Sequence, residues 1–241
     1  MKRIVLILSF LFSYHFLFSQ TCANDTCDGG EDMWNCPRDC WLDTILRILP
    51  GGGRVDWDKS GSNLIAFDRE GLDGFFDVYT MKPDTSALQC LTCGHPSIPQ
   101  KNNGQPAWHP SGNWIVFQAE KPTHPGFSSF ATPGRGAHND LWLMSPDGST
   151  VCQLTNVPND GEHGVLHPHF SHDGTKLAWS QKTFGATFQV GKEVGSWELH
   201  VADFNGCGAL TNEIVFLPGD SVFYENHSFT PDDSSIIFSS N

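Results

Sequence analysis

The chain has 241 residues, of which 39% are hydrophobic and 12% aromatic, and its formal net charge is −13 at pH 7. This apolar content is ample for a folded core, and 24 Gly with 15 Pro suit a protein with many turns. The acidic balance disfavours nucleic acid and anionic membranes as partners, because both are bound through Lys and Arg side chains that neutralise phosphates.

Residues 1–20 read as a secretory leader. Lys2 and Arg3 precede an apolar stretch, and the small residue Ser19 stands near its end, where we expect cleavage. An uncleaved membrane anchor is the disfavoured alternative, because the stretch is short and is interrupted at 13–15. We therefore expect an exported protein, periplasmic, secreted or on the cell surface, with no membrane span after leader removal and with disulfides permitted.

Residues 21–40 form a cysteine-rich module that is too short to bury a core and so needs staples. In an exported protein two disulfides are favoured, with three connectivities open. The candidates are Cys22, Cys27, Cys36 and Cys40. The spacing resembles short C-x-[ND]-x-x-C-x-x-G-E-x-x-x-x-C-P-x-D-C repeats of secreted proteins. Those often have another Cys where this chain has Met33, so their pairing is not carried over.

The same module is rich in acidic and amide side chains, which gives calcium as a possible ligand. A solvated acidic surface is favoured over calcium because the EF-hand spacing is absent, and zinc held by four thiolates is disfavoured further. The residues concerned are Asn24, Asp25, Asp28, Glu31, Asp32 and Asp39. Residues 41–53 form a linker whose apolar side chains fit either a short helix or an outer strand.

The rest of the chain repeats one pattern four times. Each copy has an anchor aromatic, a polar turn and an apolar run, and the anchors are Trp57, Trp108, Phe170 and Phe229. After each of the first three copies comes a second element, DVYTM from 77, DLWLM from 140 and ELHVA from 198, which closes on Leu-Thr. One unit is therefore four short antiparallel strands, and such units repeated radially are blades of a β-propeller.

The repeat follows the pattern aromatic-x-P-[DS]-G-x-x-[IL]-x-F, and then D-[VL]-[YW]-x-M and L-T. This pattern resembles the TolB-type propeller repeat. The resemblance covers residues 54–241 and implies an all-β fold of four-stranded antiparallel blades. The fourth copy stops after its second strand, which gives about three and a half blades. Because propellers have four to eight blades and a half blade leaves an unpaired edge, we expect a fragment of a longer chain.

Four further cysteines lie in the repeats. The C-x-x-C of Cys90 and Cys93 follows an outer strand, where a structural disulfide or exposed thiols are expected rather than a redox site. Cys152 and Cys207 lie in corresponding outer regions of adjacent blades, which we expect to be too far apart to pair. The long insertion at 118–139 is expected to be a functional or disordered loop.

The TolB resemblance implies that the strand leading into each anchor aromatic is innermost and lines a central channel. Residues three and one before the aromatic would share a face of that strand. At these places most copies carry a polar side chain, which predicts a ligand site. Three before stand Arg54, Gln105, His167 and Asn226, and one before stand Asp56, Ala107, His169 and Ser228.

The pair His167 and His169 is the sharpest member of this set, because histidines at i and i+2 on a strand can share one metal ion such as Zn, Mn, Fe or Cu. The pair resembles the H-x-H of oligogalacturonate lyases. Gly164 stands where their glutamine ligand would be, so only the two histidines are carried over. Hydrogen-bonded channel or turn histidines are the favoured alternative. His163, His172 and His227 lie nearby in sequence or at related positions.

Two functional classes follow. The chain has no G-x-S-x-G nucleophile elbow and no glycosidase carboxylate pair set by a motif, so no catalytic residue is nominated. We expect a non-catalytic exported propeller that binds a protein, peptide or glycan at the mouth of its channel. The alternative is an enzyme, either a metal-dependent lyase of the oligogalacturonate type or the N-terminal propeller of a prolyl-oligopeptidase-type peptidase.

Overall fold

The computed structural model describes residues 48–49, 51–124, 129–160, 163–184, 195–217 and 223–240. By its internal contacts the chain divides into two units, Met1–Arg47 and Ile48–Asn241, and all described residues belong to the second. The leader, the cysteine-rich module with its calcium alternative, and most of the linker therefore lie outside the described residues. Among the residues described, no helix is long and apolar enough to cross a membrane.

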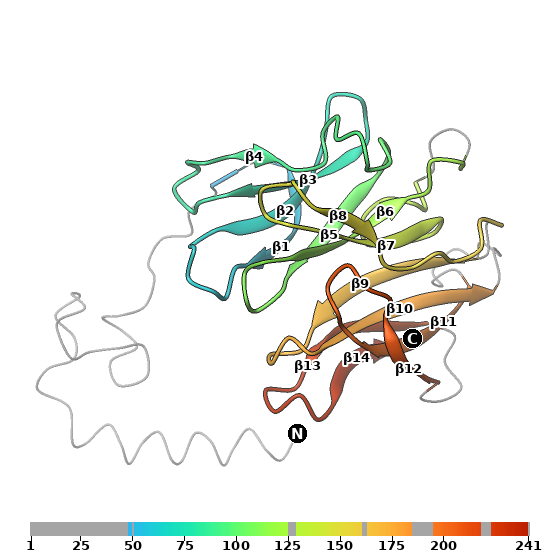
Figure 1. The fold of residues 1–241 in the computed structure, drawn as a ribbon. Coiled ribbons are helices and arrows are strands. Elements are labelled where there is room, and N and C mark those ends of the chain that lie inside the picture. Colours follow the sequence, from blue (N-terminus) through green and yellow to red (C-terminus); the bar gives the residue numbers. More distant parts are fainter. Residues whose placement is uncertain are drawn as a thin grey trace, which may run out of the picture. The chain divides into compact units, whose positions relative to one another are not determined.

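In the described part of the chain, fourteen strands make three four-stranded antiparallel sheets and one two-stranded sheet, each in chain order (Figure 1). The first sheet contains β1 (Gly52–Trp57), β2 (Ile65–Glu70), β3 (Phe76–Met81) and β4 (Gln89–Cys90). The second contains β5 (Asn103–Trp108), β6 (Ile115–Glu120), β7 (Asn139–Met144) and β8 (Val151–Gln153). The third contains β9 (Gly164–Phe170), β10 (Lys176–Phe184), β11 (Ser196–Asp203) and β12 (Thr211–Phe216). The last pairs β13 (Tyr224–Phe229) with β14 (Ile236–Ser240).

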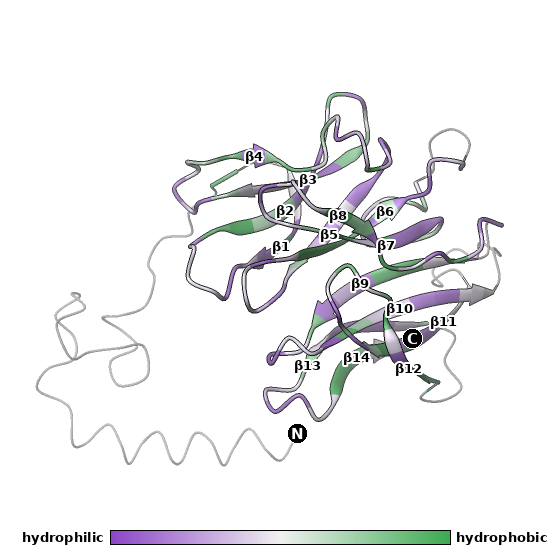
Figure 2. Cartoon of the chain, in the orientation of Figure 1, coloured by the Kyte–Doolittle hydropathy of each residue, from purple (hydrophilic) through white to green (hydrophobic). Residues whose placement is uncertain are grey.

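These sheets are the blades that the repeats predict, and the prediction of about three and a half blades is confirmed for the described residues. The hydrophobic residues lie along the strands, and the connecting turns are largely hydrophilic (Figure 2). β1 begins at Gly52, within the last residues of the predicted linker. Over the residues that the structure describes, the four sheets do not close into a ring.

The polar turn of each copy contacts the turn of the neighbouring blade. Gly174 has a φ of 74°, and a Cβ there would lie 2.5 Å from Nε2 of His109. Both the backbone conformation and the lack of space therefore favour glycine in this turn. In the fourth copy Asp233 takes a φ of 55°, which aspartate tolerates. Its carboxylate accepts hydrogen bonds from the N–H groups of His172 and Asp173, at 2.8 Å and 2.9 Å.

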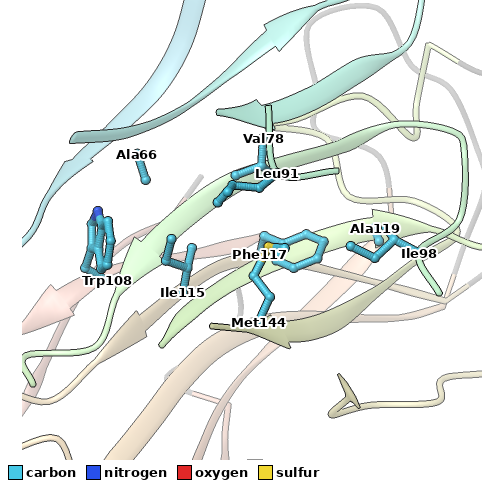
Figure 3. Close-up of a cluster of buried hydrophobic side chains, with 9 residues drawn as sticks. All are labelled: Ala66, Val78, Leu91, Ile98, Trp108, Ile115, Phe117, Ala119 and Met144. Carbon is cyan, nitrogen blue, oxygen red and sulfur yellow. The ribbon is translucent and has the colours of Figure 1, made fainter. Parts of the chain in front are cut away.

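The hydrophobic core lies between adjacent blades. Ala66 and Val78 of the first blade pack with Trp108 and other side chains of the second (Figure 3). Trp108 is only 2% exposed because it rests on the preceding blade, whereas Trp57, at the same place in the first copy, is 49% exposed. Each anchor aromatic thus seals the junction to the blade before it, and Trp57 has no such blade among the described residues.

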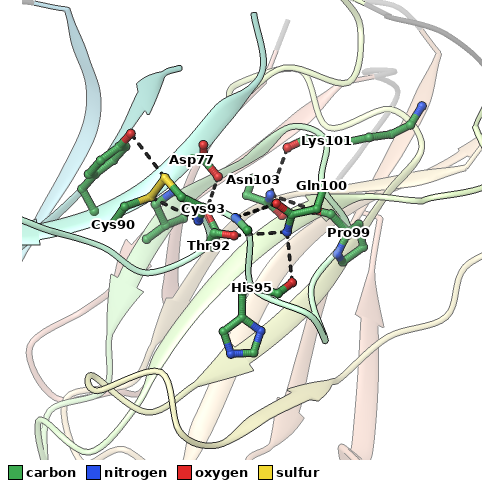
Figure 4. The surroundings of a disulfide bond; sticks show 12 residues. Asp77, Cys90, Thr92, Cys93, His95, Pro99, Gln100, Lys101 and Asn103 are labelled. Atoms are coloured by element: carbon green, nitrogen blue, oxygen red, sulfur yellow. Dashed lines mark hydrogen bonds between the residues drawn. A yellow bond between two sulfur atoms is a disulfide. The ribbon is translucent and has the colours of Figure 1, made fainter. Parts of the chain in front are cut away.

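Both cysteine pairs of the repeats form disulfides. Cys90 and Cys93 are bonded within the first blade, which confirms the structural disulfide (Figure 4). Cys152 and Cys207 are bonded as well, with their Cα atoms 5.7 Å apart, so the expectation that they are too distant was wrong. The two positions are not equivalent: Cys152 lies on β8, whereas Cys207 lies in the turn after β11, and that turn reaches Trp114 of the second blade.

The disulfide between Cys152 and Cys207 should be the stronger of the two staples, because it closes a loop with a sequence separation of 55 residues. Replacing both cysteines by serine should lower the free energy of unfolding by about 4 kcal/mol, from the loop-closure entropy restored to the unfolded chain. Urea unfolding of the oxidised proteins measures this loss. The matched control is the Cys90→Ser/Cys93→Ser double variant, whose short loop predicts a loss of about 2 kcal/mol or less. Equal losses in the two variants would contradict the expectation.

Candidate binding site on the inner strands

The first strands of the blades, β1, β5, β9 and β13, contact one another in that order (Figure 1). Each is the end strand of its own sheet, and each precedes the anchor aromatic at its carboxyl end. The residues predicted as channel-lining therefore come together on one row of neighbouring strands, as the repeat predicted.

Every one of these strands is interrupted by a register shift at the predicted ligand positions. The shifts lie between Gly52 and Val55, Gly104 and Ala107, Leu166 and His169, and Asn226 and Ser228. Gln105 and His167 take φ values of 51° and 52° there. A bulge adds a residue and breaks the alternation of side chains. The inference that residues three and one before the aromatic share a face by alternation therefore does not hold.

The bulge has a structural use, because it turns a backbone N–H away from its own sheet and toward the preceding blade. The N–H of Gln105 donates to Asp68 Oδ2 at 2.8 Å. The N–H of His167 donates to Gln105 Oε1 at 3.0 Å, and the N–H of Asn226 donates to Ser180 Oγ at 2.8 Å. These groups are buried, so leaving any of them unpaired would cost about 1–3 kcal/mol.

Several predicted ligand residues thus join blades. Asn226 donates its side-chain N–H groups to the carbonyls of His167 and Ala178, at 3.1 Å and 3.3 Å. Asp56 accepts the N–H of Trp108 at 2.6 Å through Oδ2 and also binds Lys59. Gln105, Asn226 and Asp56 are therefore engaged in the scaffold, and their role as ligand contacts stays a prediction.

Asp68 is a buried acceptor that the sequence reading missed. It is 1% exposed, and burial raises its pKa to about 6, against the opposing effect of the N–H groups of Gln105 and Arg54 and of the Arg54 charge. A sequence signal exists, because a polar residue follows the aromatic of every second strand. These residues are Asp68, Gln118, Ser180 and Ser239.

The remaining polar side chains gather around His167. Its Nδ1 lies 2.5 Å from Oε1 of Glu225, and its ring centroid lies 6.3 Å from that of His227. One ligand atom from each of these three residues lies within 4.8 Å of the other two. The structure therefore groups His167 with Glu225 and His227 of the next blade, and His169 is not part of that set.

Glu225 and His227 stand four and two residues before their anchor aromatic. The other three copies have glycine or an apolar residue at these places, namely Gly53, Gly104 and Leu166 at the first and Val55, Pro106 and Pro168 at the second. The fourth copy departs from its own repeat at both places. That departure is the sequence signal that could have found the pair.

Electrostatics in this cluster favours neutral histidines beside an ionised carboxylate. Burial lowers the pKa of His169 to about 3, helped by the positive charge of Arg54. Burial also lowers the pKa of His167, although Glu225 opposes the effect. The contact with His167 is the main cause that holds the pKa of Glu225 below its ordinary value.

Several atoms of the cluster are buried without a hydrogen-bond partner among the described residues, and Arg54 Nη1 and His169 Nε2 are two of them. Buried polar atoms of folded proteins are nearly always paired. A guanidinium N–H is a donor that suits a carboxylate, and a neutral imidazole nitrogen either donates or accepts. The cluster therefore has hydrogen-bonding groups that the described residues leave unpaired and that a ligand can pair.

A separate cavity of about 650 Å³ lies beside the second blade, lined in part by Ile98, Lys121 and Trp142. Its charged groups are already engaged, because Lys121 pairs with Asp140 and Gln153 donates to Asp140 at 3.0 Å. None of its described lining residues has a side-chain atom that is buried without a hydrogen-bond partner. The first strands of the blades are therefore the better candidate site.

No protein-family model matches the chain, and no curated protein matches it. Among solved structures, TolB from Acinetobacter baumannii superposes with a TM-score of 0.50 at 16% identity, over 78% of this chain and 37% of that one. A protein described as a TolB from Agrobacterium tumefaciens gives 0.49 at 20% identity, over 70% and 50%. Prolyl oligopeptidase B from Galerina marginata gives 0.47 at 11% identity, over 79% and 26%.

The fold is that of a TolB-type β-propeller, present in part. The repeats in the sequence predicted this fold, and the blades described above confirm it. The chain spans half or less of the length of these solved structures. At such low identity the likeness concerns the TolB-type fold alone, and it brings no ligand or activity with it.

The hydrogen bond between Gln105 and the N–H of His167 can be tested by truncation. Gln105→Ala removes the acceptor of a buried donor and should lower the free energy of unfolding by about 1–3 kcal/mol. Urea unfolding measures the loss. The control is Gln89→Ala on β4, where the side chain is exposed and the change should stay within about 0.5 kcal/mol. Indistinguishable variants would show that this bond does not hold the blades together.

Asp68 predicts a pH effect on stability. Its folded pKa of about 6 lies above the ordinary value of 3.8, so the folded state holds the proton more tightly than the unfolded chain does. Its stabilising contribution is complete below the ordinary pKa and is lost as the pH rises through the folded pKa. Asp68→Asn keeps an oxygen for Gln105 but cannot ionise. The variant should therefore gain stability relative to wild type between pH 4 and pH 7, by about 2–3 kcal/mol.

Urea unfolding at four pH values across this window measures that gain. The control is Asp147→Asn, because hydrogen bonds from Ser145 and Ser149 hold the pKa of the exposed Asp147 at about 2, below its ordinary value. Its contribution is lost only at lower pH, so this variant should run parallel to wild type between pH 4 and pH 7. Parallel curves for Asp68→Asn as well would contradict the predicted titration.

Proposed function

We propose that this chain is part of an exported, non-catalytic TolB-type propeller that binds a carboxylate-bearing segment of a protein, peptide or glycan at the mouth of its channel. The observation that carries the proposal is the pair of buried atoms without a partner among the described residues, Arg54 Nη1 and His169 Nε2, on the first strands of the first and third blades. A ligand that supplied their hydrogen bonds would relieve the cost of burying them unpaired.

The chemistry of the cluster supports a carboxylate as the contact group. Burial lowers the pKa of the Arg54 guanidinium below its ordinary value, and the charges of Glu225 and Asp68 oppose that shift. Because an arginine stays protonated even so, its fork of N–H groups is the strongest available donor to a planar carboxylate. His169, neutral through burial, lies close enough for its pKa to respond to Arg54 and would complete the contact without adding a like charge.

The compartment follows from covalent chemistry. Two disulfides in the described residues fit an oxidising environment, in agreement with the leader that residues 1–20 predict. The proposal is an exported location, which is the periplasm, the medium or the cell surface. The non-catalytic assignment rests on the sequence, which has no nucleophile elbow.

Binding can be tested with the full oxidised chain on arrays of acidic peptides and of uronic-acid glycans, followed by calorimetry on the best binder. Arg54→Ala should weaken that binding by about 10-fold or more, because hydrogen bonds to a charged group contribute about 1.5–3 kcal/mol. The control is Lys82→Ala, since Lys82 is an exposed cation between β3 and β4, outside the first strands of the blades.

Three results would count against the proposal. Binding that Arg54→Ala and Lys82→Ala weaken equally would place the ligand elsewhere. Failure of every acidic peptide and glycan to bind would remove the carboxylate as the contact group. Cleavage of a bound probe would move the protein to the enzyme class.

A further inference from the structure

His167, Glu225 and His227 bring two imidazoles and one carboxylate together at the junction of the third and fourth blades. Nδ1 of His167 lies 2.5 Å from Oε1 of Glu225, in a contact that lacks the alignment of a well-formed hydrogen bond. Imidazole nitrogens and carboxylate oxygens gathered in this way are ligands that divalent transition metals accept.

The three residues supply a suitable donor set. Their ligand atoms all lie within 4.8 Å of one another. A tetrahedral ion bound at about 2.1 Å needs ligand atoms about 3.4 Å apart, so the contact between His167 and Glu225 has to open by on the order of 1 Å and the more distant atoms have to approach by a similar amount. Two imidazoles and one carboxylate, with further positions open to water, are a common set for divalent transition metals.

Hydrogen bonds hold in place the two strands that carry these ligands, β9 and β13, before any ion binds. The bulge on β9 sets His167, whose N–H is held by Gln105. Asn226, between the other two ligands in sequence, is tied to β9 and β10 by its N–H and its side chain. Ring nitrogen Nε2 of His227 lies 3.0 Å from Ser239 Oγ, a contact that orients the imidazole as outer partners of metal ligands do.

Charge favours the same conclusion. A metal ligand must be an unprotonated imidazole or an ionised carboxylate. Glu225 is half-buried, and the Arg54 guanidinium is a cation near it. Arg54 lowers the affinity for a second cation, so the site suits an ion that forms strong bonds to nitrogen, such as Zn²⁺, rather than Ca²⁺.

We propose that His167, Glu225 and His227 form a site for a divalent transition metal, with Zn²⁺ as the first candidate. The site bridges the third and fourth blades through β9 and β13 and uses one histidine of the H-x-H pair. This inference goes beyond the ligand proposal and does not require it, because the metal alone is the probe.

The test uses the full oxidised chain, stripped of metal and shown by thiol titration to have no free cysteine, because residues 21–40 hold four further cysteines. Zn²⁺ stoichiometry is measured by mass spectrometry after dialysis, and affinity by competition with a chromophoric chelator. Co²⁺ absorption reports nitrogen ligation. Wild type should bind one equivalent. Glu225→Gln and His227→Gln, which keep the side-chain volume similar, should each weaken binding by on the order of 100-fold.

The controls are His169→Ala, the other histidine of the H-x-H pair, and His163→Ala, which pairs with Asp160 instead. Both should bind Zn²⁺ as wild type does, and urea unfolding confirms that every variant is folded. The proposal is overturned if wild type binds no stoichiometric metal, if Glu225→Gln and His227→Gln bind it unchanged, or if His169→Ala loses as much as they do.

Discussion

The second, third and fourth blades are each held to the blade before them by a hydrogen bond that their first strand donates. A bulge takes one N–H out of its own ladder, and a side chain of the preceding blade accepts it: Asp68 for Gln105, Gln105 for His167 and Ser180 for Asn226. The positive φ at Gln105 and His167 costs on the order of 1 kcal/mol each, and the buried bond offsets that strain. Packing of the anchor aromatics between blades follows from the spacing that these bonds set.

The same bulge creates the candidate site. Because it breaks the alternation of side chains, residues close in sequence separate into two groups with different roles. Gln105 and Asn226 turn to neighbouring blades and serve the scaffold. Arg54 and His169 keep buried atoms unpaired, and His167 meets the next blade through Glu225. A substitution in the first group is expected to act through stability, and one in the second through binding, although both groups stand on the same strands.

The blades could be predicted because their signals are local and repeated: an aromatic, a turn with Gly174 or Asp233, and an apolar run. The bulges could not be predicted. Glutamine and histidine do not indicate a positive φ by their residue type, and one extra residue leaves the hydrophobic periodicity almost unchanged. The Cys152–Cys207 bond was missed because equivalence between blades was assumed for a strand and a turn. Glu225 was not predicted because it is not part of the shared pattern: the other three copies have Gly or Leu at its place.

The bond between Cys152 and Cys207 also sets how the molecule responds to proteases. It closes a covalent ring that starts on the outer strand of the second blade and ends in the last turn of the third. A cut anywhere inside that ring leaves both fragments attached to each other until thiols reduce the bridge. In an oxidising compartment such a nicked chain keeps its second and third blades joined, so proteolytic damage there does not by itself separate these two blades.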